Sequence, residues 1–396
     1  MENLDIYKDI AERTDGDIYV GVVGPVRTGK STFIKKFMEL LVLPNIANEY
    51  KRERAIDELP QSAAGKTIMT TEPKFIPNEA VEITIADNLK LKTRMVDCVG
   101  YLVNNAIGYL EDDMPRMVKT PWSAEEIPFE RAAEIGTKKV IEEHSSIAIL
   151  VTTDGSITGI PREDYVEPEE RVARELTAKQ KPFVIVLNAE DPFSEENKRL
   201  ACELEDKYNT AVVPLNCTEL SLENINDIFS KILFEFPIEQ INIKFPRWIE
   251  GLQDTNEIKT ELFSEIKDCF TNTKKLKEVS DDVAKLQSTQ VITRTEITKI
   301  DLGTGNVELS ISLKDELFYK VLTEITGEEI ADEGKLFAKI TEFSRIKKEY
   351  DKLEYALHEV REKGYGIVNP TVDDLILEEP EIIRQGSKFG VKLKAK

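Results

Sequence analysis

The chain has 396 residues, of which 41% are hydrophobic and 32% charged, which is typical of a soluble protein with about two or three globular domains. Its formal net charge of −21 argues against a nucleic-acid partner, because a phosphate backbone would repel so acidic a surface. Four scattered cysteines favour free thiols in a reducing cytosol, and without a secretory signal or a membrane-length apolar run the sequence predicts a cytoplasmic protein.

The first predicted unit is a strand, a loop and a helix over residues 17–41. A β-branched apolar run at 18–23 predicts a buried parallel strand, and apolar residues at helical spacing follow the loop. Between them, residues 24–31 read GPVRTGKS, a complete match to the phosphate loop G-x-x-x-x-G-K-[ST]. In such loops the lysine, here Lys30, reaches the β- and γ-phosphates, and the hydroxyl of Ser31 binds Mg²⁺. The residues expected to contact the nucleotide here are Gly24, Arg27, Thr28, Gly29, Lys30, Ser31 and Thr32.

Thr70 and Thr71 lie between this helix and the next predicted strand. P-loop switch proteins carry at this place a threonine that senses the γ-phosphate and binds Mg²⁺. Either threonine could be the catalytic sensor, and the sequence does not choose between them. Thr70 is in addition an expected metal ligand. The alternative is that both simply start the strand at 74–76.

An antiparallel pair of strands is predicted at 81–85 and 89–96, and the second strand runs into D-x-x-G. Asp97 is therefore expected beside the phosphate loop, where its carboxylate can hold Mg²⁺ directly or through water. Gly100 is expected to offer its backbone N–H to the γ-phosphate and to act as a hinge. Residues 101–135 then form a long insertion, either a lid or partner surface or a solvated loop.

The next strands are predicted at 146–152 and 181–188. The guanine-reading motif N-K-x-D of GTPases would fall on 188–191, but Ala189 replaces its lysine, which favours adenine over guanine. Asn188 and Asp191 remain candidates for lining the base pocket. A helix, a strand and a helix over 195–234 complete the alternating pattern.

The predicted fold is an α/β P-loop NTPase (GTPase-like) domain with a mixed, mostly parallel sheet at 1–236, followed by an α+β middle domain at 237–396. A helix over 335–363 has an apolar stripe, for which packing within its own domain is favoured over binding a partner helix. The last eight residues, 389–396, read as part of a strand, which predicts a further C-terminal region.

Four segments of the chain resemble the stage IV sporulation protein A family, the morphogenetic ATPases of the bacterial spore coat. They are GDIYVGVVGPVRTGKSTFIKKFMEL, ELPQSAAGKTIMTTEPKF, MVDCVGY and EPEIIRQGSKFGVKLKA. The family is a branch of the translation-factor-type P-loop GTPases that uses ATP. The resemblance implies phosphate and Mg²⁺ binding by Lys30 and Ser31, sensing by Thr70 and Thr71, and a metal-side acid at Asp97.

The resemblance also implies a biological role. Family members hydrolyse ATP to drive self-assembly into a static polymer, the platform for coat assembly, on the outer forespore membrane in the mother-cell cytoplasm. The implied partners are further copies of the chain, other coat morphogenetic proteins, and the membrane through a small amphipathic peptide. The favoured hypothesis is such an ATPase. The alternatives are a GTP-dependent switch that recruits a partner without polymerising, and a scaffold that nucleotide only stabilises.

Overall fold

The computed structural model of the chain describes residues 3–60, 73–85, 89–104, 110–111, 114–120, 122–123, 125–286, 291–368, 376, 378–386 and 388–394. The chain divides into two compact units, residues 1–312 and 313–396. The predicted domain boundary at residues 236 and 237 lies inside the first unit and stays a prediction.

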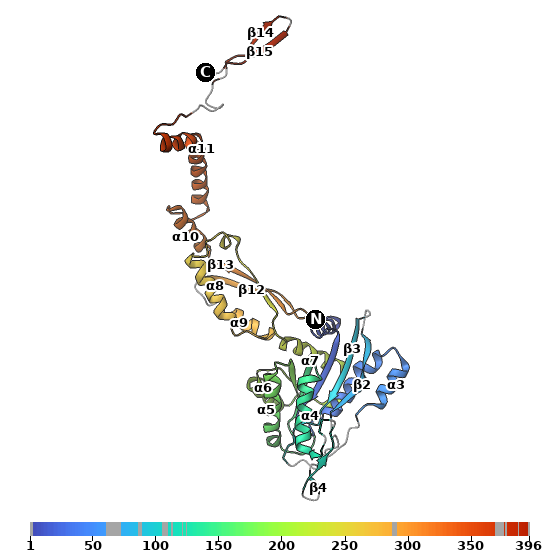
Figure 1. The fold of residues 1–396 in the computed structure, drawn as a ribbon. Helices are drawn as coiled ribbons and strands as arrows, with labels where there is room; N and C mark the ends of the chain where they lie inside the picture. The colour runs from blue at the N-terminus through green and yellow to red at the C-terminus, as the bar shows by residue number, and fades with distance from the viewer. Residues whose placement is uncertain are drawn as a thin grey trace. The chain divides into compact units, whose positions relative to one another are not determined.

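A six-stranded sheet forms the centre of the first unit, with strand order β10-β9-β8-β1-β3-β2 (Figure 1). Every neighbouring pair is parallel except β2 and β3, which are antiparallel as predicted. β8 and β9 are buried along their whole length, which explains their uninterrupted apolar sequences. The predicted α/β fold with a mixed, mostly parallel sheet is therefore confirmed. The strands are β1 (Asp17–Val23), β2 (Lys74–Ile85), β3 (Leu89–Asp97), β8 (Ile147–Thr153), β9 (Phe183–Asn188) and β10 (Val212–Leu215).

Helices cover both faces of this sheet, and alternate residues of β8 point into the two different hydrophobic cores on these faces. Ile149 packs in a core with α1, α2 and α7, whereas Leu150 packs in a core with α4, α5 and α6. The hydroxyls of Ser194 and Ser221 accept backbone N–H groups and so cap the starts of α6 and α7. The helices are α1 (Asn3–Arg13), α2 (Lys30–Phe37, continued by a π-helical turn at Met38–Val42), α3 (Glu49–Asp57), α4 (Phe129–Glu143), α5 (Arg162–Ala178), α6 (Glu195–Tyr208) and α7 (Leu222–Glu235).

A smaller sheet follows in the same unit, with order β11-β13-β12 and with β11 parallel to β13. Leu302, Val307 and Leu309 from this region belong to the same hydrophobic core as Phe229 of α7. This shared core explains why the first unit extends to Ser312. The elements are β11 (Gln240–Lys244), α8 (Glu257–Phe270), α9 (Val279–Leu286), β12 (Ile292–Asp301) and β13 (Asn306–Leu313).

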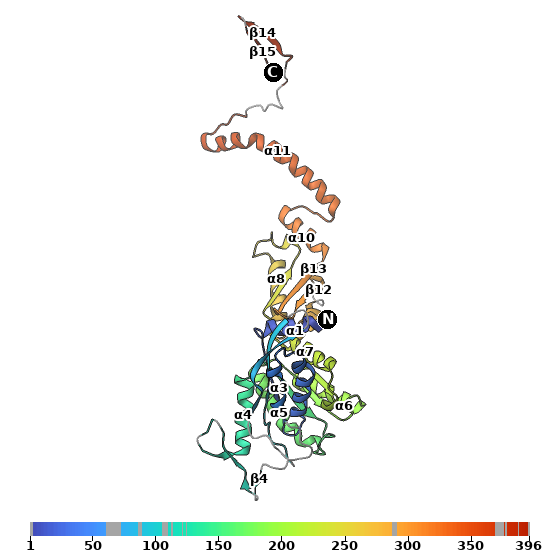
Figure 2. The same ribbon diagram turned by 90° about the vertical axis from the view of Figure 1, so that its right-hand side faces the viewer.

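The second unit contains α10 (Asp315–Thr326), α11 (Glu333–Lys363) and the hairpin of β14 (Glu381–Gln385) with β15 (Lys388–Lys392) (Figure 2). The side chain of Asp332 accepts the backbone N–H of Lys335 and caps α11, and Gly364, with φ +82°, ends it as predicted. The expectation that the apolar stripe of α11 packs within its own domain is wrong for the described residues, because that stripe is exposed. Among the described helices, none is both long and apolar enough to cross a membrane.

Candidate nucleotide-binding and active site

The phosphate loop links β1 to α2 in a turn that two glycines make possible. Gly24 has φ +139° and Gly29 has φ +94°, and a Cβ on Gly24 would lie 2.2 Å from the carbonyl oxygen of Val151 in β8. Lys30, the first residue of α2, is buried, and its Nζ donates to the carbonyls of Gly24 at 3.3 Å and Pro25 at 2.6 Å. Burial lowers the pKa of Lys30. The loop thus holds a buried ammonium group at the positive end of a helix, which suits phosphate.

The other residues of this loop that were predicted to contact the nucleotide, Thr28, Arg27 and Thr32, differ in how deeply their side chains are buried. Thr28 is fully buried and its hydroxyl donates to the carbonyl of Pro25 at 3.1 Å, so its side chain shapes the loop. Arg27 is half-buried and has a left-handed backbone, with φ +65°. Thr32 lies half-buried in the first turn of α2. The backbone of Arg27 is therefore held in a conformation that few side chains adopt, as in many ligand-binding turns.

Ser31 and Asp97 meet at the ends of α2 and β3, which adjoin because β1 and β3 are parallel neighbours. The hydroxyl of Ser31 donates to Oδ2 of Asp97 at 2.7 Å. Asp97 is only 2% exposed, and its Oδ1 has no hydrogen-bond partner among the described residues. Burial raises the pKa of Asp97, and the nearby Lys30 opposes that shift.

This arrangement fits a magnesium ion, which prefers oxygen ligands and uses one or two protein groups plus substrate phosphates. Oδ1 of Asp97, which is buried and has no partner among the described residues, and the hydroxyl of Ser31 are ligands of that kind. No group of three or more His, Cys, Asp or Glu side chains able to hold a metal occurs in the described part of the chain. Thr70 and Thr71, the predicted sensors, lie outside the described residues.

Gly100 lies directly against the phosphate loop. Its φ is +91°, and a Cβ on it would lie 2.2 Å from the carbonyl oxygen of Gly24 and 2.7 Å from Nζ of Lys30. The backbone N–H of Val26 also donates to the carbonyl of Tyr101 at 2.9 Å. The D-x-x-G segment and the phosphate loop are therefore one packed structure, in which only glycine fits at position 100.

Tyr101 is a residue of this site that sequence reasoning missed. Its hydroxyl donates to the carboxylate of Glu175 in α5 at 2.7 Å, and the guanidinium of Arg171 stacks 4.4 Å from the centre of its ring. Burial and the neighbouring Glu175 raise its pKa. The pairing joins the end of D-x-x-G to α5, and no sequence motif marks it because the partners are more than 70 residues apart.

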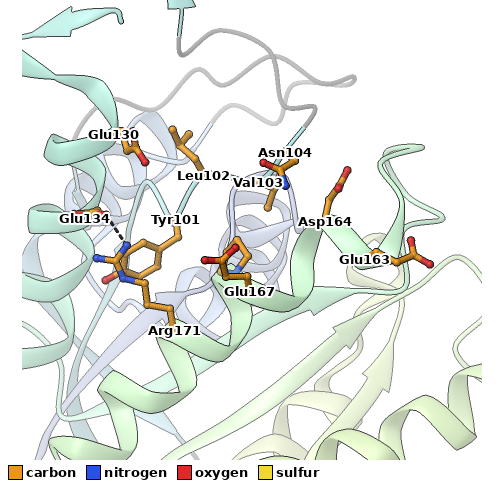
Figure 3. A pocket seen from close by; sticks show the side chains of 11 residues that line it. Tyr101, Leu102, Val103, Asn104, Glu130, Glu134, Glu163, Asp164, Glu167 and Arg171 are labelled. Atoms are coloured by element: carbon orange, nitrogen blue, oxygen red, sulfur yellow. Dashed lines mark hydrogen bonds and ion pairs between the residues drawn. The ribbon is translucent and has the colours of Figure 1, made fainter.

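A separate cavity of about 290 Å³ lies beyond Tyr101, between α4 and α5 (Figure 3). Carboxylates dominate its wall, and Arg171, which is paired with Glu134, is the one basic residue among the described residues that line it. It contains no residue of the phosphate loop, and its negative charge would repel a nucleotide. The lining residues are Tyr101, Leu102, Val103, Asn104, Glu130, Glu134, Glu163, Asp164, Glu167, Pro168 and Arg171.

The predicted insertion 101–135 contains two short pairs of strands. They are β4 (Leu110–Glu111) with β5 (Met114–Pro115), and β6 (Met117–Val118) with β7 (Ile127–Pro128).

Asn188, at the end of β9, is only 4% exposed and joins two loops. Its Nδ2 donates to the carbonyl of Thr28 at 3.0 Å, and its Oδ1 accepts the backbone N–H of Cys217 at 3.0 Å. Asp191 is exposed and accepts the backbone N–H of Phe193 at 3.3 Å. Ala189 is fully buried. The structure thus brings Asn188, but not the side chain of Asp191, into contact with the phosphate loop.

Comparison with known proteins places the chain in a family. A family model of the stage IV sporulation protein A ATPase domain matches residues 1–237, and one of its middle domain matches residues 238–396. The chain belongs to the stage IV sporulation protein A family. It is 50% identical over 393 residues to stage IV sporulation protein A of Clostridioides difficile (strain 630), covering 99% of this chain and 80% of that protein. It is 47% identical over 395 residues to that of Bacillus subtilis (strain 168), covering 100% and 80%.

Membership of the stage IV sporulation protein A family assigns the phosphate loop and Asp97 to an ATPase domain of a sporulation protein. The match to the ATPase-domain model over residues 1–237 supports an ATP-hydrolysing enzyme.

Proposed function

We propose that the chain binds ATP and Mg²⁺ at the phosphate loop and uses slow ATP hydrolysis to drive its own assembly into a static polymer, the basement layer of the spore coat. The observation that carries the chemistry is the contact of Ser31 with buried Asp97, whose second carboxylate oxygen lacks a partner among the described residues. It lies in a domain of an ATPase family, beside a buried lysine at a helix start.

The catalytic contribution of the chain is positioning and charge. Lys30, held by two loop carbonyls, would neutralise charge on the phosphate oxygens, where negative charge gathers during phosphoryl transfer. Ser31 and Asp97 would hold Mg²⁺, which when bound neutralises the same oxygens. The N–H of Gly100 would bind the γ-phosphate, and Thr70 or Thr71 would orient the attacking water. Ala189, in place of the guanine-reading lysine, supports ATP over GTP.

The proposed place of action is the outer surface of the forespore membrane, on the mother-cell cytoplasmic side. The chain would be peripheral there, bound to further copies of itself, to other coat morphogenetic proteins, and to the membrane through a small amphipathic peptide. The relatives named stage IV sporulation protein A support this setting by their sporulation role.

The test is phosphate release from the 396-residue protein with ATP or GTP, together with sedimentation of the same samples. We expect preference for ATP, a loss of at least about 100-fold in Asp97→Asn and Lys30→Ala, and sedimentation of the wild type alone. Glu170→Ala, which removes an exposed carboxylate in the middle of α5, is the control and should behave as wild type.

Three results would contradict the proposal in different ways. Faster cleavage of GTP would favour a guanine-nucleotide switch. Unchanged hydrolysis in Asp97→Asn would remove Asp97 from the site. Normal sedimentation of Lys30→Ala would mean that assembly needs no hydrolysis and that the chain is a scaffold.

A further inference from the structure

The apolar stripe of α11 follows the spacing of a coiled coil. Six apolar residues recur at steps of three, four, three, four and three. Leu336 lies one heptad before Phe343, although Lys339 takes the position between them. This is the a and d pattern of a heptad, a narrower seam than the wide apolar face of an ordinary surface helix. From Leu336 to the last seam residue it covers roughly 36 Å of helix. The six residues, hereafter the α11 seam, are Phe343, Ile346, Tyr350, Leu353, Leu357 and Val360.

The α11 seam is exposed along its whole length. Its side chains range from 40% exposed at Phe343 to 51% at Ile346 and Tyr350. Of the residues of α11, Ala356 is the one buried side chain, and it is not part of the seam. In the described part of the chain, all six side chains of the seam are thus left exposed to solvent. A contiguous exposed seam of this kind marks a protein interaction site.

The charges beside the seam identify the occupant and its direction. If two copies of α11 pair antiparallel with Tyr350 facing Leu353 of the second copy, Phe343 faces Val360, so each aromatic ring meets a smaller aliphatic side chain. In the same register Ile346 faces Leu357, which has the same size. In that register Lys347 lies opposite Glu354 of the second copy, and by symmetry this attractive pair occurs twice. Glu342 and Lys363 are matched in the same way on the other side of the seam.

A parallel pair fits less well. It would place Glu342 opposite Lys347 of the second copy, an attractive pair, but also Glu349 opposite Glu354, a repulsive pair that offsets it, whereas the antiparallel register has two kinds of attractive pair. It would also stack Phe343 and Tyr350 on their own counterparts. We propose that α11 binds α11 of a second copy of this chain as an antiparallel two-stranded coiled coil, centred between Tyr350 and Leu353.

This inference adds one contact between copies to the polymer of the proposed function, and it rests on that function only because a polymer requires such contacts. The pairing itself needs no nucleotide, because α11 belongs to the second compact unit and carries none of the phosphate-loop residues. A two-fold contact closes on itself, so it yields a dimer, and a polymer would need a further contact elsewhere. Dimer formation and ATP hydrolysis can therefore be measured separately.

The test is sedimentation velocity of the 396-residue protein without nucleotide over a range of concentrations. We expect a monomer–dimer equilibrium that Leu353→Asn abolishes. Glu354→Lys should weaken the dimer about tenfold, because it faces Lys347 of the second copy in both pairs, and Lys347→Glu should do the same. The double variant Lys347→Glu/Glu354→Lys should restore the wild-type dissociation constant. Lys348→Glu, the same charge change one residue away from the seam flank, is the matched control and should shift it less than about twofold.

Each other result has a defined meaning. A wild type that stays monomeric throughout, or a double variant that is not restored, would overturn the proposal. Tighter dimers in Glu354→Lys would show a parallel pair and overturn the register. Far-UV circular dichroism must show that the variants keep their helix content, which separates loss of pairing from loss of the helix. Phosphate release distinguishes the two proposals: Leu353→Asn should hydrolyse ATP as wild type, and a wild type that dimerises without hydrolysing ATP would refute the proposed function alone.

Discussion

At the scale of single residues, Asp97 couples metal binding to pH. Burial raises its pKa above the ordinary carboxyl value, so in the absence of metal the folded chain favours the protonated form. Protonation of Asp97 therefore stabilises the folded chain relative to the unfolded chain. This stabilisation is fully present below the pKa that Asp97 has in the unfolded chain, and it is lost as the pH rises through its pKa in the folded chain. Metal binding requires the ionised form, so protons and Mg²⁺ compete for the same carboxylate.

We therefore predict an acid limb in the pH profile of ATP hydrolysis, at a pH above the ordinary carboxyl pKa. Raising the Mg²⁺ concentration should move this limb to lower pH, because the metal displaces the proton. The measurement is phosphate release across the acid range at two Mg²⁺ concentrations. A limb that does not respond to Mg²⁺ would assign the titration to another group.

The position of Asn188 in the fold was predictable from the sequence, but the contacts of its side chain were not. From sequence it was a candidate for lining the base pocket at the end of the strand 181–188. In the structure both of its amide atoms hold neighbouring loops, at the carbonyl of Thr28 and the backbone N–H of Cys217. Its rotamer depends on loops 29 residues and 160 residues away along the chain, which no local pattern specifies. The phosphate-loop residues were predictable because their spacing is local, whereas Tyr101 and its contacts with α5 were not.

We predict that Asn188→Ala costs about 1–3 kcal/mol of unfolding free energy, since it leaves a buried carbonyl and a buried N–H without partners. It should also weaken nucleotide binding, because the carbonyl of Thr28 is no longer fixed. Asp191→Ala, three residues on and exposed, should change stability by no more than about 0.5 kcal/mol. Urea unfolding and titration with a fluorescent ATP analogue measure both effects. Equal losses of stability in the two variants would contradict the bracing role of Asn188.

At the scale of elements, α5 is joined to the sheet by a buried carboxylate that the sequence did not reveal. Glu169 is fully buried and accepts hydrogen bonds from Arg162 at 2.8 Å and Tyr208 at 2.8 Å, and also from Thr152 of β8. From sequence it was one of several charged residues on a helix, and such residues are usually solvated. Burial and the adjacent Glu169 raise the pKa of Tyr208, so the phenol stays a donor to this carboxylate.

We predict that Glu169→Ala lowers the free energy of unfolding by about 3–5 kcal/mol, because it leaves Arg162 without its buried partner. The neighbouring Glu170 is the matched control. It is exposed and pairs with Arg174 at 3.1 Å and Lys207 at 3.4 Å, so Glu170→Ala should cost no more than about 1 kcal/mol. Urea unfolding at neutral pH measures the difference, and similar costs for the two variants would mean that Glu169 is not a structural carboxylate.

For α11, the amphipathic pattern predicted the helix but not what its apolar stripe contacts. Its period predicted a helix over 335–363, and the structure has Glu333–Lys363, with the predicted glycine stop. The pattern could not say what covers the apolar stripe, because a core, a partner helix and a second copy all require the same spacing. The exposure of the α11 seam in the described part of the chain argues against a core, and the charges beside the seam favour a second copy over another partner helix.

At the scale of the whole molecule, the two compact units are expected to respond to different ligands. If the two compact units unfold as separate cooperative units, the chain does not unfold in one two-state step. The first unit holds the phosphate loop, so ATP with Mg²⁺ should stabilise it by mass action, by about 2.7 kcal/mol at a concentration 100 times the dissociation constant. The second unit holds the α11 seam, so its stability should instead rise with protein concentration.

Differential scanning calorimetry of the 396-residue protein should therefore show two transitions with separate controls. ATP and Mg²⁺ should move one of them upward, and Lys30→Ala should abolish that movement without affecting the other. Raising the protein concentration should move the second transition upward, and Leu353→Asn should abolish that response. If nucleotide moved both transitions together, the two units would be energetically coupled, and ATP binding in the first unit would itself bias pairing through the second. Because pairing through α11 is proposed to need no nucleotide, that result would contradict the independence of the two units on which the dimer experiment depends.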